Sequence, residues 1–219
     1  MTDVTITVRG EHERRVPAEQ AVVSLRLAVE GSERAEVVER IGALAAPLTD
    51  DLAAREHGDG LVEWSSRRMT VWSERPWSDG RRLAPVHHAA VDLTATFDDP
   101  TALSAWVTGV AEREGVQITD IDWRLTPVTR AGIEREVAAE AVGVAVDRAT
   151  AYAAALGRDS VRPVEVADVG LLSPPTDPAP AAQMMRASFA AEGEAQEMLR
   201  LQPEDIVVRA AVEARFSAR

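Results

Sequence analysis

Alternation of apolar and polar side chains constrains the fold of this 219-residue chain more than any other feature. The clearest case is residues 206–216, where apolar side chains occupy every second position over eleven residues. A period of two places successive side chains on opposite faces of a β-strand, so each such stretch predicts a half-buried strand. Strands are predicted at 4–9, 21–29, 61–73, 86–97, 117–125, 161–169 and 206–216.

Three other segments repeat apolar residues every three or four positions, which is typical of amphipathic helices. The first follows the N-cap residue Ser32 and contains Pro47, which predicts a kink or an early stop there. The second begins with Asp99 as N-cap and Pro100 as its first residue. The third runs from about 128 to 156, with a buried face predicted at Ala138, Val142, Ala145, Ala149, Tyr152 and Leu156.

The resulting order, β-β-α-β-β-α-β-α-β-β, predicts an α+β fold with a largely antiparallel sheet. Residues from about 20 to 125 have the order of a split βαβ, ferredoxin-like unit. An α-β-β unit from about 126 to 219 is added, together with strand 4–9. We expect one domain over 1–219, with two lobes at these boundaries as the alternative.

The charge and composition exclude several classes of protein. Net charge is −12, which disfavours binding to nucleic acids and to anionic membranes. Cysteine and lysine are absent, which excludes disulfides, thiolate zinc sites, thiol catalysis and Schiff-base chemistry. No stretch has the pattern of a secretory signal or a membrane-spanning helix, so we expect a cytoplasmic protein without membrane insertion.

No pattern of residues indicates a catalytic, cofactor-binding or metal site. His87 and His88 are adjacent in a predicted strand and therefore point to opposite faces, and His12 and His57 lie elsewhere in the sequence. The acidic groups at 98–99, 120/122 and 134/136/140 have the spacing of a helix cap and of solvated faces. Nucleophile-elbow, P-loop and dinucleotide-binding motifs are also absent. The sequence therefore favours a protein that is not an enzyme.

The candidate interaction surface consists of large apolar side chains in predicted loops. Tryptophans near a turn either fold back onto the sheet or form an interface. Residues 173–203 begin with a proline-rich stretch and are predicted to be a flexible or partner-docking insertion, with a loosely held helix at 181–199 as an option. The candidate residues are Trp72, Trp77, Met184, Met185 and Phe189.

Three arginine pairs, at 14–15, 67–68 and 81–82, have two interpretations. Guanidinium groups bind carboxylates and phosphates through paired hydrogen bonds, so a pair can recognise an anion. Exposed arginines are also common on solvated sheet faces, and the flanking residues favour this second interpretation.

The order and spacing of four segments resemble the SIMPL-domain proteins, many of which are bacterial envelope proteins. The segments are residues 6–31 (ITVRGEHERRVPAEQAVVSLRLAVEG), 79–125, 136–157 (EVAAEAVGVAVDRATAYAAALG) and 201–216 (LQPEDIVVRAAVEARF). The resemblance implies an α+β fold with a long N-terminal β-hairpin and a tendency to form homo-oligomers. It further implies roles in stress protection or in binding a signalling partner, without established catalytic residues.

Together these observations predict a non-enzymatic, SIMPL-like protein that self-associates or binds a protein partner. The alternative is a small-molecule-binding module or a hydrolase that uses a cleft between the two lobes.

Overall fold

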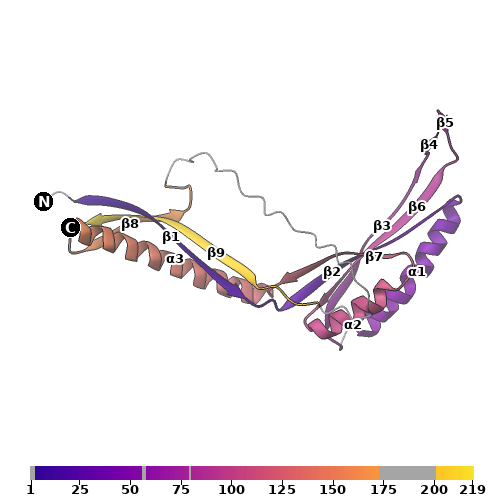
Figure 1. Ribbon diagram of the computed structural model, residues 1–219, viewed down its shortest axis with the longest axis horizontal. Helices are drawn as coiled ribbons and strands as arrows, with labels where there is room; N and C mark the ends of the chain where they lie inside the picture. The colour runs from indigo at the N-terminus through magenta and orange to yellow at the C-terminus, as the bar shows by residue number, and fades with distance from the viewer. Residues whose placement is uncertain (1–2, 56–57, 79, 173–200) are drawn as a thin grey trace, which may run out of the picture. The chain divides into compact units, whose positions relative to one another are not determined.

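The computed structural model describes residues 3–55, 58–78, 80–172 and 201–219. They form two compact units, which we call the terminal unit and the central unit (Figure 1). The terminal unit comprises the described residues of Met1–Val16, Thr126–Ala195 and Asp205–Arg219. The central unit comprises those of Pro17–Leu125 and Gln196–Glu204. Both units combine helices with antiparallel strands, so the predicted α+β class is confirmed.

The terminal unit is a three-stranded antiparallel sheet with one helix packed on it. The strand order is β1-β9-β8, and Figure 1 shows α3 along one face of this sheet. β1 and β9 pair without interruption from Val4 opposite Ala218 to Val16 opposite Ile206. The elements are β1 (Val4–Val16), α3 (Pro127–Ala155), β8 (Val161–Asp168) and β9 (Ile206–Ala218).

Helix α3 begins at a cap that its sequence supplies. The Thr126 hydroxyl accepts a hydrogen bond from the Thr129 backbone N–H at 3.3 Å, and Pro127 takes the first helical position. The predicted buried face of this helix was wrong in part, because Ala138, Tyr152 and Leu156 are exposed. Its buried positions instead recur every four residues, at Ile133, Val137, Ala141, Ala145, Ala149 and Ala153.

The alanine stripe lets the helix approach the strand closely at one point. A Cβ atom added to Gly10 of β1 would lie 1.9 Å from the Ala141 carbonyl oxygen and 2.7 Å from the Ala145 backbone nitrogen. Both distances are far below van der Waals contact. Only glycine therefore fits where β1 crosses α3.

The central unit is a four-stranded antiparallel sheet in the order β3-β6-β2-β7, with α1 and α2 on one face. Strand β6 lies between β2 and β3, the two strands that α1 connects. A short pair, β4 (Trp77–Ser78) and β5 (Arg81–Arg82), joins β3 to β6. The other elements are β2 (Gln20–Gly31), α1 (Arg34–Arg55), β3 (Leu61–Glu74), β6 (Val86–Phe97), α2 (Pro100–Ala111) and β7 (Val116–Arg124).

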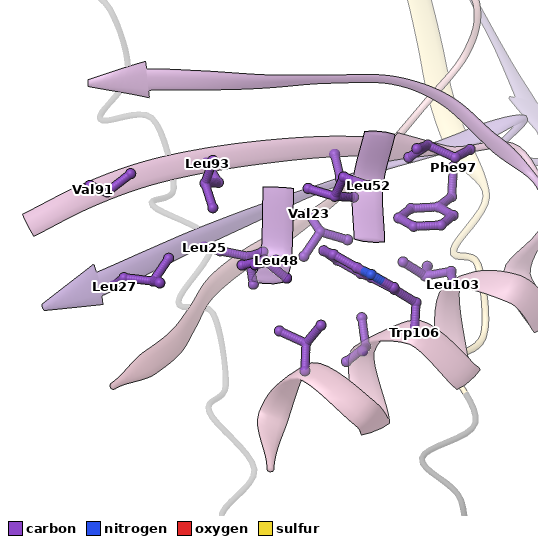
Figure 2. Packing of buried hydrophobic residues seen from close by; sticks show 14 of the residues in the cluster. Val23, Leu25, Leu27, Leu48, Leu52, Val91, Leu93, Phe97, Leu103 and Trp106 are labelled. Carbon is purple, nitrogen blue, oxygen red and sulfur yellow. The ribbon is translucent and has the colours of Figure 1, made fainter. Parts of the chain in front are cut away.

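The core of the central unit contains the apolar faces of β2 and β6 and of both helices. Figure 2 shows the Trp106 indole of α2 reaching into this core, towards Val23 and Phe97. The Trp106 and Phe97 rings lie 5.2 Å apart, and Trp106 Nε1 donates a hydrogen bond to Asp51 Oδ2 at 2.9 Å. The indole is thus both buried and hydrogen-bonded, as a core tryptophan requires.

The early stop predicted at Pro47 was wrong, because α1 continues through it to Arg55. The residues beyond the proline hold the helix in place: Leu48 and Leu52 are completely buried. The Thr49 hydroxyl also donates to the backbone oxygens of Ala45 and Ala46, in the turn where proline lacks an N–H. Burial of two leucines outweighs the cost of the missing hydrogen bond.

The first two strands belong to different sheets. β1 and β2 follow each other with only residues 17–19 between them, as the predicted N-terminal hairpin required. β1 pairs with β9, however, and β2 pairs with β6 and β7. The connection thus leads from the terminal unit into the central unit.

None of the described helices is long and apolar enough to cross a membrane.

The N-cap of α2 provides a first testable prediction. Asp99 accepts a hydrogen bond from the Thr101 backbone N–H at 2.8 Å, so replacing it with alanine is expected to lower the free energy of unfolding of the central unit by about 1 kcal/mol. Urea denaturation followed by tryptophan fluorescence measures this, because all five tryptophans lie in 17–125. Asn can still cap the helix, so Asp99→Asn is the control. Equal losses in both variants would contradict the capping role.

Candidate interaction surface

The β3–β6 hairpin extends past the end of the sheet. The last pair between β2 and β6 is Gly31 with His87, and the last pair between β3 and β6 is Glu74 with Val86. Beyond these pairs, β4 and β5 pair only with each other, and the Leu83 N–H donates to the Pro76 oxygen at 2.9 Å. We call residues 75–85 the hairpin arm (Figure 1).

Trp77, the tryptophan of the hairpin arm, has 64% of its surface accessible. The Arg82 guanidinium lies over its ring at 5.6 Å from the centroid, within cation–π distance. Leu83 is 49% exposed in the same arm. The arm therefore presents an aromatic ring, an aliphatic side chain and a cation to solvent.

Trp72 is held against the sheet on one side. Its ring stacks on His88 with the centroids 5.0 Å apart and the planes 12° from parallel, yet 40% of the residue stays exposed. The two candidate tryptophans thus differ. Trp72 packs against His88 of the neighbouring strand β6, whereas Trp77 is largely exposed to solvent. The other candidates, Met184, Met185 and Phe189, lie outside the described residues.

The adjacent histidines of β6 make separate sets of contacts. His88 Nδ1 lies 3.6 Å from Glu30 Oε2, and its Nε2 lies 3.3 Å from Glu74 Oε1. The second contact is not a hydrogen bond. Within the part of the chain that the structure describes, no three histidine or acidic side chains are grouped so that they could hold a metal ion.

His87 and Ser73 are close enough to be compared with the serine–histidine pair of a hydrolase. Ser73 Oγ and His87 Nδ1 are 2.6 Å apart, a distance seen between a serine nucleophile and its base. The residues are direct neighbours across β3 and β6. In a Ser-His-Asp triad a carboxylate also contacts the second nitrogen of the histidine, and among the described residues no carboxylate contacts His87. The arrangement is that of an ordinary cross-strand hydrogen bond.

The acidic groups singled out in the sequence mostly serve structural contacts. Asp99 caps α2, Glu136 forms an ion pair with Arg14 of β1, and Glu134 lies 3.9 Å from Arg130. Asp120 and Asp122 are exposed on β7. These placements bring no two of the three acidic groups together.

The arginine pairs have different surroundings. Arg14 pairs with Glu136, and Arg81 and Arg82 form β5 in the hairpin arm. Arg67 and Arg68 line a pocket on the central sheet with Ser24, Asp92, Thr94 and Thr119. Sequence reasoning missed these last four residues, because they come from three strands and form no motif along the chain.

No curated protein matches the chain. The model of one protein family, SIMPL, described as "Protein of unknown function (DUF541)", matches residues 6–216. This match covers nearly every strand and helix of both units, from β1 to β9. The chain therefore belongs to the SIMPL family.

Proposed function

We propose that the protein is a non-enzymatic binding protein that self-associates through its hairpin arm. The observation that carries the proposal is the exposure of Trp77 on a two-stranded arm that extends beyond the sheet. Large exposed aromatic side chains with an arginine beside them are typical of the residues that dominate protein interfaces. The proposal includes a cytoplasmic location, which fractionation of cells expressing the untagged chain would test.

Charge favours a second copy of this chain as the partner. The hairpin arm contains three arginines and one aspartate, a net charge of +2. Because the whole chain carries −12, the remainder carries −14. A basic arm on an acidic protein is attracted to the surface of another copy, and such attraction weakens as salt screens it.

The test is the molar mass in solution, measured by size-exclusion chromatography with light scattering over a range of concentrations. Wild-type protein is expected to show a multiple of 23.6 kDa, and Trp77→Ser is expected to weaken association by about 30-fold or more. Arg82→Gln is expected to weaken it as well and to reduce its dependence on salt.

Two matched substitutions serve as controls. Val128→Ser removes an apolar side chain that is 83% exposed on α3, and Arg113→Gln removes an exposed arginine outside the arm. Both are expected to keep the wild-type mass. A mass of 23.6 kDa for wild type at every concentration would refute self-association, as would equal loss in the control variants.

A further inference from the structure

A polar pocket of about 380 Å³ lies on the central sheet. Ser24 of β2 and Thr94 of β6 face each other within it and alternate along their strands with the buried residues Leu25 and Leu93. Because those leucines point into the core beneath α1 and α2, the pocket lies on the opposite face of the sheet. Its volume is within the range of small-molecule sites, about 300–1,000 Å³.

Two β-bulges at the same level of the sheet shape this pocket. β3 shifts register between Ser66 and Arg68, which makes Arg67 an extra residue in the strand. β7 shifts at the level of Ser24, which makes Thr119 the extra residue there. Both extra residues line the pocket. Bulges redirect side chains and are frequent beside functional sites.

The bulge in β3 explains how two consecutive arginines line one pocket. Neighbours in a regular strand point to opposite faces, whereas Arg67 and Arg68 both border the cavity. Among the described residues, neither guanidinium has a hydrogen-bond or ion-pair partner. Asp92, also in the lining, has Arg26 at 3.9 Å. The pocket thus has two unpaired cations and one carboxylate with a cation beside it.

Three residues with hydroxyl groups, Ser24, Thr94 and Thr119, also line the pocket, together with Leu25 and Leu93. Thr94 Oγ1 lies 2.9 Å from Ser65 Oγ, and either hydroxyl can donate to the other. Thr119 donates to the Ser24 backbone oxygen at 3.0 Å, which fixes the position of its hydroxyl. Groups of this kind add short-range donors and acceptors to the charge of the arginines.

We propose that this pocket binds a small phosphorylated metabolite that carries free hydroxyl groups, such as a sugar phosphate. A phosphoryl group offers several oxygens to two guanidinium forks and to nearby hydroxyls. The Asp92 carboxylate only accepts hydrogen bonds, so it suits the hydroxyl groups of such a ligand. The site is distinct from the hairpin arm and does not depend on self-association.

A second hollow, on β1 and β9, does not fit this chemistry. It has a volume of about 460 Å³, with Glu11, Glu13 and Arg209 in its lining. Arg209 Nε is already 2.8 Å from Glu13 Oε2. Its cation is therefore neutralised by a direct ion pair, and a second carboxylate lies beside it.

Isothermal titration calorimetry at low ionic strength tests the proposal with glucose 6-phosphate, inorganic phosphate and glucose as probes. We expect saturable binding of glucose 6-phosphate at one site per chain, weaker binding of phosphate and none of glucose. Arg67→Gln and Arg68→Gln are each expected to weaken binding by about tenfold or more, the loss typical of one charged hydrogen-bonding partner.

Arg113→Gln, which removes an exposed arginine of the same unit outside the pocket, is expected to bind as wild type does. Light scattering is expected to show an unchanged molar mass for the Arg67 and Arg68 variants, which separates this site from self-association. The proposal is overturned if none of the phosphorylated probes binds at millimolar concentration. It is also overturned if phosphate binds as tightly as glucose 6-phosphate, if glucose binds equally well, or if Arg113→Gln loses as much affinity as the pocket variants.

Discussion

Gly10→Ala is expected to destabilise the terminal unit by about 3 kcal/mol, the upper end of the cost of overpacking a well-packed contact. The added Cβ would lie 1.9 Å from the Ala141 backbone oxygen, and a backbone atom cannot move aside as a flexible side chain does. β1 and α3 must therefore separate. Thermal unfolding followed by far-ultraviolet circular dichroism measures the loss, because α3 spans 29 residues of helix.

The matched control is Gly143→Ala in α3. A Cβ added at Gly143 meets nothing within 4 Å, and alanine has the higher helix propensity. This variant is expected to stabilise the unit by about 1 kcal/mol, so the two glycine-to-alanine changes have opposite signs. Tryptophan fluorescence, which reports only on the central unit, is expected to show an unchanged transition in both variants. A Gly10→Ala variant as stable as wild type would contradict the close contact of β1 with α3.

Trp106→Ala is expected to lower the unfolding free energy of the central unit by about 3–5 kcal/mol. The substitution leaves a cavity beside Phe97 and removes the donor that satisfies Asp51 Oδ2. Arg55 Nε still donates a hydrogen bond to Asp51 Oδ1 at 3.2 Å, so the carboxylate keeps one hydrogen-bond partner. Urea denaturation followed by the fluorescence of the four remaining tryptophans measures the change.

Two further tryptophan variants separate the loss of buried apolar area from the loss of the hydrogen bond to Asp51. Trp106→Phe keeps most of the apolar area and loses the hydrogen bond, so its expected cost is about 1–2 kcal/mol. Trp77→Ala removes an exposed ring and is expected to change stability by less than about 0.5 kcal/mol. If Trp106→Ala cost no more than Trp77→Ala, the indole would not be part of the core.

The sequence predicts the helices and most strands because burial on one face imposes a period on the residues. Strand β1 is the exception: it reaches Val16, well beyond the alternating stretch 4–9, and the polar segment that follows was predicted only as an optional extension of the strand. Its second half, from Glu11 to Arg15, is charged or polar on both faces, so no alternation is visible. Pairing with β9 supplies the backbone hydrogen bonds that hold this half extended. Such pairing involves residues almost 200 positions away and leaves no local signal.

The two candidate sites also differ in whether the sequence pattern predicts them. Trp77 stands out in the sequence because an exposed tryptophan beside a turn is unusual. The pocket on the central sheet cannot be recognised in the sequence, because it depends on the bulges at Arg67 and Thr119. Neither position is a glycine, the residue that most often marks a bulge in a sequence. The strand pattern would place Arg67 and Arg68 on opposite faces, and only the three-dimensional register places them together.

Because β1 pairs with β9, the sheet of the terminal unit can form only late in synthesis on the ribosome. β1 is synthesised before the other described elements, and its partner β9 only begins at Ile206. At about 5–20 residues per second, β1 waits roughly 10–40 s for the strand that completes its sheet. The central unit lies almost wholly between them and can fold during that interval. The growing chain thus carries β1 without its partner strand until β9 emerges, and unpaired strand edges are prone to aggregation during that period.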